Sequence, residues 1–448
     1  MVSSRSIGWM DERDHVVRKL YALFIVCTAI SLNPFKLAWA SPCQAAIYSP
    51  CRPASSIFPC VPSIVVSPRT WLATMMTISC RLVAVAVALA LAAALLSSSP
   101  LRGDVRAVVE IRDVELIPVD GGAAGPESVA FGVGGEGPYA GVSDGRVIRW
   151  LPEEGRWVEH SSAAAPELLD SCRGSQDPMK EHECGRPLGL KFNNKTGELY
   201  VADSYFGLRV VSPGDNVSRL IGPGQPGRPY SFANGVEIDQ ETGVVYFTET
   251  STRFQRRQFL NIVISGDATG RLLKYDPNTN EVQVLVDGLA FPNGLLMSEG
   301  GSHLLLAETT TCMIHRYWLK TPKASTLEEL VQLPGFPDNI KASPRGGFWV
   351  GLHGKRGKIA EWSTSFPWLR RLVMKLPPQR VQRVMAFLSR FGSQVIALRV
   401  SEEGKVLEEV IVHDAARKMF GSISELEERD GRLWIGSVHL PFLGHYCL

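Results

Sequence analysis

The body of the sequence, from about residue 107 onward, contains no Cys-x-x-Cys pair; its cysteines are Cys172, Cys184, Cys312 and Cys447. A structural zinc site is therefore not expected, because such sites usually draw thiolates from closely spaced pairs. A surplus of charge is missing as well, since 47 basic and 45 acidic side chains leave a net charge of +2. We therefore expect no nucleic-acid partner.

The cleanest apolar run, Leu82 to Leu96, has about 15 residues and falls short of the roughly 20 that a transmembrane helix needs. Arg81 precedes the run, and Ser97 to Ser99 follow it. A charged start, an apolar core and small residues after it are typical of a secretory signal peptide or signal anchor. We interpret residues 75–99 as such a segment, with a buried core helix as the alternative.

The residues before this segment do not resemble a domain. They contain a second candidate signal, in which the apolar stretch Leu20 to Ile30 precedes Ala38-Trp39-Ala40, a candidate signal-peptidase site. Because tandem signals are unusual, we interpret residues 1–74 as a non-globular extension and place the translation start at Met75 or Met76. Either signal predicts that the body enters the secretory pathway and lies in the endomembrane lumen.

Two features of the body suit that compartment. Cys172 and Cys184 bracket a polar loop, which is the right setting for a disulfide; two unrelated surface thiols are the alternative. Asn194-Lys-Thr and Asn216-Val-Ser are N-glycosylation sequons. Sequons are frequent by chance, so they add only weak support.

From about residue 107 the sequence consists of short strand patterns that recur between turn residues. Six segments of similar sequence open these repeats: Pro126–Phe131, Pro187–Phe192, Ala233–Ile238, Pro292–Met297, Pro337–Ala342 and Ile423–Glu428. Their spacing of about 45 to 60 residues, with one longer interval, is typical of four-stranded propeller blades. We predict an all-β fold, a six-bladed β-propeller over residues 107–448. The segment Val108 to Ile117 is expected to complete the last blade, and a β-sandwich is the alternative fold.

The long fifth interval contains an insert, residues 362–391. It has no acidic residue and carries several arginines and one lysine, with apolar residues at helical spacing. A basic amphipathic helix of this kind can lie on an anionic membrane surface. Packing on the propeller as a cap over one face is the other interpretation. A second possible membrane contact is anchoring of the protein through the apolar residues 82–96.

Polar residues occupy the same phase of several repeat openings: Glu127, Asn234, Asn293, Asp338 and Asn339. In a propeller the loops that open the inner strands surround one end of the central tunnel, so these side chains are expected to converge. Two carboxylates with several amide oxygens suit Ca²⁺ or Mg²⁺ better than a soft metal. The alternative is that these residues only satisfy tight turns.

Several motifs of the body together resemble the strictosidine synthase-like proteins of plants. These are Cys184–Asn193, Val201–Leu208, Val245–Ser251, Gly270–Pro277 and Asp430–Gly436. The resemblance covers about three quarters of the chain. It implies a six-bladed propeller that enters the secretory system and reaches the vacuole or the extracellular space. It also implies a disulfide in the second blade, whose spacing Cys172 and Cys184 match.

True strictosidine synthase joins tryptamine to the aldehyde secologanin with a single glutamate as its acid and base. In this sequence Ser424 stands at that position, six residues before Asp430. Serine cannot shuttle the proton that a carboxylate would. Glu425 is adjacent, but on a strand it should point to the opposite face. An amine–aldehyde condensing activity is therefore disfavoured.

The wider superfamily includes paraoxonases and other calcium-dependent lactonases and esterases. The openings at Pro292 and Pro337 are similar to their metal-binding segments, which implies Asn293, Asp338 and Asn339 as ligands, with Glu127 and Asn234 as less close matches. Paraoxonases carry a histidine where this sequence has Leu188, so the general base is not identified. His353, after the fifth inner strand, is a weak candidate, and a structural histidine is the plainer interpretation.

Three hypotheses follow for the function. The first is a metal-dependent hydrolase of esters or lactones, with Ca²⁺ as its cofactor and a small molecule as its substrate. The second is the condensing enzyme, and the third is a non-catalytic binding propeller of the lumen in which the ion is structural.

Overall fold

The computed structural model describes residues 107–111, 113–221, 230–356, 395–412, 420 and 422–448. All of them belong to the second of two units into which the chain divides, Ser98–Leu448. The predicted extension (1–74), signal segment (75–99) and helical insert (362–391) lie outside the described residues. Within these described ranges, no helix has the length and apolar character needed to cross a membrane.

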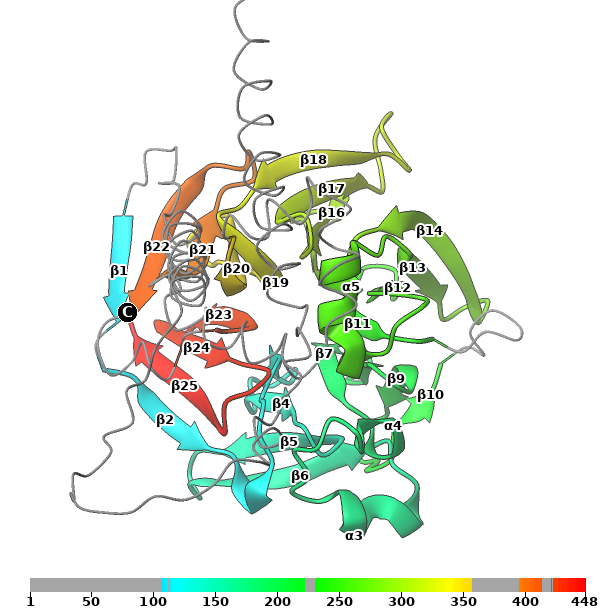
Figure 1. Cartoon of the computed structure of the whole chain (residues 1–448), viewed down its shortest axis with the longest axis vertical. Helices are drawn as coiled ribbons and strands as arrows, with labels where there is room; N and C mark the ends of the chain where they lie inside the picture. The colour runs from blue at the N-terminus through cyan, green and yellow to red at the C-terminus, as the bar shows by residue number, and fades with distance from the viewer. Residues whose placement is uncertain (1–106, 112, 222–229, 357–394, 413–419, 421) are drawn as a thin grey trace, which may run out of the picture. The chain divides into compact units, whose positions relative to one another are not determined.

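Six mainly antiparallel sheets stand around a common centre in the order of the sequence (Figure 1). Blade one contains β3 (Val129–Ala130), β4 (Tyr139–Gly141), β5 (Arg146–Leu151) and β6 (Arg156–Ser162). Blade two contains β7 (Pro187–Phe192), β8 (Leu199–Asp203), β9 (Gly207–Val211) and β10 (Arg219–Leu220). Blade three contains β11 (Ala233–Ile238), β12 (Val245–Glu249), β13 (Gly270–Asp276) and β14 (Glu281–Leu289).

The remaining blades follow the same plan. Blade four contains β15 (Pro292–Met297), β16 (His303–Glu308), β17 (Met313–Trp318) and β18 (Leu327–Gln332). Blade five contains β19 (Gly335–Ala342), β20 (Phe348–Lys355), β21 (Val395–Val400), β22 (Val406–Val412) and β1 (Ala107–Ile111). Blade six contains β23 (Glu425–Arg429), β24 (Arg432–Gly436), β25 (Phe442–Cys447) and β2 (Glu115–Pro118). The predicted six-bladed propeller is confirmed, and a β-sandwich is excluded.

One prediction about ring closure was wrong in part. Only β2 completes the last blade, where it pairs antiparallel with β25, whereas β1 pairs parallel with β22 of blade five. The two strands join different blades because each buries one isoleucine in a different inter-blade core. Ile111 packs with residues of blades five and six, and Ile117 packs with residues of blades six and one.

The core lies mainly between the blades, because six of the apolar clusters each combine side chains from two neighbouring blades. Between blades two and three, for example, Tyr200 and Leu208 pack against Ile238 and Phe247. Full burial of one large apolar side chain contributes roughly 1.5–3 kcal/mol. Strands such as β8, β11 and β12 are wholly buried, which is the pattern of a sheet covered on both faces, whereas the outer strands β10 and β18 are exposed or half-buried.

A short helical segment covers the ring where the inner strands begin. It consists of η3 (Arg256–Gln258) and α5 (Phe259–Ser265), between β12 and β13, and α5 lies in front of β11 in Figure 1. Ile262 of α5 is fully buried against Leu188, Phe232 and Phe291. These three residues lie at or just before the starts of the inner strands of blades two, three and four.

Three further short helices lie on the loops: η1 (Asp120–Gly122), η2 (Pro166–Leu168) joined to α3 (Leu169–Cys172), and α4 (Glu181–Cys184). A disulfide between Cys172 and Cys184 connects α3 to α4, as both the loop setting and the family resemblance predicted.

Candidate functional site

The predicted metal ligands come from four inner-strand openings. Asn234 and Asn293 are the second residues of β11 and β15, and Asp338 and Asn339 follow Pro337 within β19. Glu127 lies two residues before β3. The strand pairing shifts register at the openings of β11, β15 and β19. Such irregularities turn a side chain out of the sheet alternation, here toward the centre of the ring.

We call these five residues the ligand cluster, and hydrogen bonds connect four of them in pairs across blades. Asn293 Nδ2 donates to Asp338 Oδ1 at 2.6 Å, and Asn339 Nδ2 donates to Glu127 Oε1 at 3.3 Å. Asn234 Nδ2 donates to Thr250 Oγ1 at 3.0 Å. Blades one, four and five are therefore joined directly through the predicted ligands, and Asn234 lies on the neighbouring blade three.

Three oxygen atoms of the ligand cluster are buried without a hydrogen-bond partner in the described part of the chain: Glu127 Oε2, Asn234 Oδ1 and Asn293 Oδ1. All five side chains of the cluster are buried. A buried polar atom without a partner is costly, and a coordinated cation would satisfy several such atoms at once. These three oxygen atoms are therefore suitable ligands for a hard cation.

The charges of the cluster lead to the same conclusion. Burial raises the pKa of Glu127, an effect that Arg186 and Arg256 partly offset. Burial and then the nearby Glu127 carboxylate raise the pKa of Asp338 well above its usual value. Two carboxylates that both resist ionisation would lose a proton readily to a dication.

Oxygen donors dominate the site. Among the described residues no group of three or more His, Cys, Asp or Glu side chains could hold a metal, so an ion at this site would need amide oxygens as further ligands. A set of two carboxylates and three amides suits Ca²⁺, which accepts six to eight oxygen ligands, and it also suits Mg²⁺.

Two histidines lie next to the ligand cluster. His353 Nδ1 is 3.7 Å from Asp338 Oδ2 and 3.2 Å from Ser422 Oγ, and its ring centre is 5.8 Å from that of His439. Burial and the charge of Arg256 lower the pKa of His353 to about 4. Burial lowers the pKa of His439 to about 3, with contributions from His353 and Arg256. Both rings are therefore neutral near pH 7.

Ser424 has a structural role in this arrangement. It is fully buried, its Oγ donates to the main-chain oxygen of Glu127 at 2.6 Å, and its carbonyl accepts from Asn339 N at 2.9 Å. The hydroxyl thus joins blade six to the opening of blade one and leaves no carboxylate at this position.

Glu425 lies on the wall of the ring and faces blade one. Its carboxylate accepts from Val129 N at 2.6 Å and from Ser128 Oγ at 3.0 Å, and Lys341 Nζ lies 3.2 Å away. Burial raises its pKa to about 7, although Lys341 opposes the shift. Glu425, Ser128, Lys341 and Asn339 are among the residues of all six blades that line a central cavity of about 20 Å³, room for about one water molecule.

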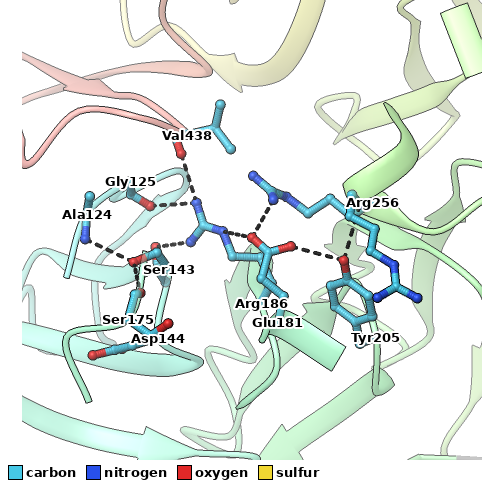
Figure 2. Close-up of polar contacts among 12 residues, drawn as sticks. Ala124, Gly125, Ser143, Asp144, Ser175, Glu181, Arg186, Tyr205, Arg256 and Val438 are labelled. Atoms are coloured by element: carbon cyan, nitrogen blue, oxygen red, sulfur yellow. Dashed lines mark hydrogen bonds and ion pairs between the residues drawn. The ribbon is translucent and has the colours of Figure 1, made fainter. Parts of the chain in front are cut away.

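An ion-pair network that the sequence did not predict supports the cluster from the side (Figure 2). Arg186 is fully buried, and its Nη2 donates to Gly125 O at 2.9 Å and to Val438 O at 3.3 Å. Glu181 Oε1 lies 4.0 Å from Arg186 Nε and also forms an ion pair with Arg256. Gly125 lies two residues before Glu127, and Val438 precedes His439, so Arg186 fixes the backbone beside both.

The remaining predicted positions are not members of the cluster. Leu188 packs in the apolar contact with α5, so no base stands there. Asn194, between β7 and β8, and Asn216, between β9 and β10, are both exposed.

Sequence reasoning missed Arg186, Glu181, Arg256 and His439. Arg186 lies within one of the motifs that resemble the family, but no pattern in the sequence indicated that its side chain is buried. The other three come from loops outside the repeat phase, so only the closed ring brings them to the cluster.

Solved structures with similar folds are distant in sequence. A gluconolactonase from Xanthomonas campestris is 14% identical with a TM-score of 0.49, covering 75% of this chain and 90% of that one. A calcium-binding regucalcin from Agrobacterium tumefaciens is 11% identical with a TM-score of 0.47, covering 75% and 95%.

Family comparisons are much closer. A family model described as strictosidine synthase matches residues 234–322, and one described as strictosidine synthase-like, N-terminal, matches residues 110–150. Strictosidine synthase-like protein 10 of Arabidopsis thaliana is 48% identical over 329 residues, covering 73% of this chain and 86% of the relative. Protein 2 of the same series is 44% identical over 351 residues, covering 77% and 92%. The chain belongs to the strictosidine synthase-like family.

Proposed function

We propose that the protein is a divalent-metal-dependent hydrolase of esters or lactones. The observation that carries the proposal is the convergence of two buried carboxylates with amide oxygens that have no partner among the described residues, next to a neutral histidine pair. A site of this kind can hold a hard cation beside a base, and that combination suits attack of water on a carbonyl group.

The ligand cluster would hold the ion, which suits Ca²⁺ best because of the number of oxygen donors. When bound, such an ion polarises a carbonyl oxygen and lowers the pKa of a water molecule. Asn293 and Asn339 orient the two carboxylates through the bonds they donate to Asp338 and Glu127. Arg186 fixes the main chain before Glu127 through Gly125 O.

His353 is the proposed proton acceptor. With its proton on Nδ1, toward Ser422 Oγ and Asp338 Oδ2, the ring presents the lone pair of Nε2. Burial keeps this imidazole neutral near pH 7, so the lone pair is available for a proton from water. His439 packs against the same ring and limits its rotation.

The condensing reaction fits this site poorly. Its carboxylate is replaced by Ser424, whose hydroxyl is already bonded to Glu127 O, and Glu425 faces blade one. The non-catalytic alternative has one observation in its favour. The ligand oxygens are nearly inaccessible, with Glu127 at 3% and Asn234 at 3% exposure, as in a structural ion site.

The test is hydrolysis of phenyl acetate and of γ-butyrolactone by purified protein with calcium and with a chelator. We expect activity that chelation abolishes, that added calcium restores, and that Asp338→Ala lowers at least about a hundredfold, since it removes a charged ligand. Asp287→Ala, an exposed position on outer strand β14, is the control. Activity indifferent to chelation and to Asp338→Ala would refute the proposal, and tight calcium binding without turnover would favour the structural ion.

We also propose that the protein acts in the lumen of the secretory pathway. The disulfide between Cys172 and Cys184 and the exposure of Asn194 and Asn216 support an oxidising, glycosylating compartment. Protein from a plant host should lose apparent mass on treatment with an N-glycosidase. An unchanged mass, with free thiols at both cysteines, would contradict the proposal.

A further inference from the structure

Arg256 lies at the edge of the proposed active site. It opens η3, and Phe259, three residues later, contacts the His353 ring with centres 6.4 Å apart. His353 in turn lies 3.7 Å from Asp338. On its other side Arg256 pairs with Glu181, and Figure 2 shows its guanidinium between Glu181 and Val438, the neighbour of His439.

Arg256 shares its carboxylate partner with a second guanidinium. Glu181 is the one carboxylate that pairs with both Arg186 and Arg256. Asp203 is occupied by main-chain N–H groups of Arg186, Tyr205 and Phe206. The Asp203 carboxylate also stabilises the charge of Arg186, whereas the carboxylate that Arg256 contacts is the shared Glu181.

Arg256, and not Arg186, has guanidinium donors left for a ligand. Arg186 is fully enclosed and donates to the carbonyls of Gly125 and Val438. Arg256 keeps 12% of its side chain exposed. Among the described residues its only side-chain hydrogen bond is the one that Nη1 donates to Glu181, so other guanidinium donors can reach a ligand.

We propose that Arg256 binds a carboxylate group of the substrate, and that the protein therefore prefers anionic esters or lactones to neutral ones. The inference rests on the proposed hydrolase function and specifies its substrate class. A guanidinium presents parallel N–H donors that match a carboxylate.

The electrostatic influence of Arg256 on the cluster agrees with this position. Its charge lowers the pKa of His353 and of His439, and it offsets part of the rise in the pKa of Glu127 and of Asp338. A carboxylate bound to Arg256 would thus lie within electrostatic reach of the ligand cluster and the histidine pair.

The experiment compares 4-acetoxybenzoate with methyl 4-acetoxybenzoate, which differ in one negative charge. We expect the wild type to favour the anion in kcat/KM. Arg256→Met should lower the ratio of the two kcat/KM values about tenfold or more, the typical effect of losing a charge-assisted hydrogen bond. Arg256→Lys keeps the charge and the pair with Glu181, so it should fold normally and give an intermediate ratio.

Arg253→Met is the matched control. Arg253 lies on the same loop, is 64% exposed and pairs with Asp267, so its removal should leave the ratio unchanged. An equal loss for both esters in Arg256→Met, with the ratio preserved, would mean that Arg256 only positions η3 through Glu181. That result would overturn the inference.

Calorimetric binding of 4-hydroxybenzoate, with calcium and with a chelator, separates this inference from the hydrolase proposal. If neither ester is hydrolysed but 4-hydroxybenzoate binds and Arg256→Met weakens it about tenfold, the hydrolase proposal fails and the anion site stands. If the neutral ester is hydrolysed in a calcium-dependent way but Arg256→Met changes neither the ratio nor the binding, only the anion site fails.

Discussion

Glu127 and Asp338 share a buried site in which burial and then the Glu127 carboxylate disfavour ionisation of Asp338. We expect this repulsion to destabilise the fold without a cation and to favour binding of a dication. Asp338→Asn removes one charge and keeps an acceptor for Asn293 Nδ2, which now bonds Asp338 Oδ1. We expect the variant to be about 1 to 3 kcal/mol more stable than the wild type in chelator.

The same variant should gain no stability from calcium. The wild type should gain about 2.7 kcal/mol at a calcium concentration a hundred times its Kd. Thermal unfolding in chelator and in calcium measures both effects, and Asp287→Asn controls for charge removal at an exposed position. If the Asp338→Asn protein is less stable than the wild type in chelator and is still stabilised by calcium, the two carboxylates are not coupled through one ion.

Glu425 should make the stability depend on pH. Burial raises its folded pKa to about 7 from a usual value of 4.5. The folded state therefore binds more protons than the unfolded state between these values, and this contribution to stability is lost as the pH rises through 7. Glu425→Gln removes the effect, while Glu427 still pairs with Lys341.

Denaturant unfolding at pH 5 and pH 8 tests this prediction. The stability of Glu425→Gln relative to the wild type should increase by about 3 kcal/mol between the two values, at about 1.4 kcal/mol per pH unit up to pH 7. A difference between the two proteins that does not change with pH would show that Lys341 keeps Glu425 ionised throughout.

At the residue scale, the sequence indicated candidate site residues only within the repeated strand openings. Asn234, Asn293 and Asp338 could be predicted because each opens an inner strand at the same phase. Arg256 and His439 follow no repeat, and their approach to His353 depends on how η3 and the loop after β24 fold over the ring. No local pattern encodes that geometry.

At the scale of elements, close approach of neighbouring inner strands sets the spacing of the ligands. A Cβ atom at Gly235 on β11 would lie 2.4 Å from Asn293 O on β15. A Cβ at Gly436 on β24 would lie 2.7 Å from Glu127 O. Since real Cβ atoms do not approach carbonyl oxygens so closely, a side chain at either position must push a ligand-bearing backbone away.

Gly235→Ala should therefore destabilise the protein by about 2 to 3 kcal/mol and weaken calcium binding at least about tenfold. Chemical unfolding and calcium titration measure the two effects. Gly354→Ala on β20 is the control, because a Cβ there meets only the Phe336 ring at 4.0 Å, and its stability should change by less than about 1 kcal/mol. Unchanged calcium affinity in Gly235→Ala would mean that strand spacing does not position the ligands.

The element pattern was predictable to a large extent. β7, β11 and β15 coincide with the predicted openings Pro187–Phe192, Ala233–Ile238 and Pro292–Met297. The division between β1 and β2 was not predictable, because both are short strands with similar apolar patterns. Their partners are decided by which inter-blade core receives Ile111 and which receives Ile117.

At the scale of the whole propeller, blade six combines the two ends of the described chain. β2 comes from its N-terminal side and β23 to β25 from its C-terminal end, so this blade closes the ring. Each blade shares its core with both neighbours, and a ring without a free end has no blade that can separate without exposing two cores. The propeller is therefore expected to unfold as one cooperative unit.

Leu443→Ala tests this cooperativity at the closing blade. Leu443 of β25 is fully buried and packs with Ile117 of β2 and Val129 of blade one, so its truncation should cost about 3 kcal/mol. Far-UV circular dichroism and tryptophan fluorescence, which reports on blades including Trp157 of blade one and Trp318 of blade four, should shift together to lower denaturant. Val108→Ala, at a position 51% exposed on β1, should change little. Two separated transitions in Leu443→Ala would mean that blade six opens alone, and the ligand cluster would then lose its link through Ser424 before the other blades unfold.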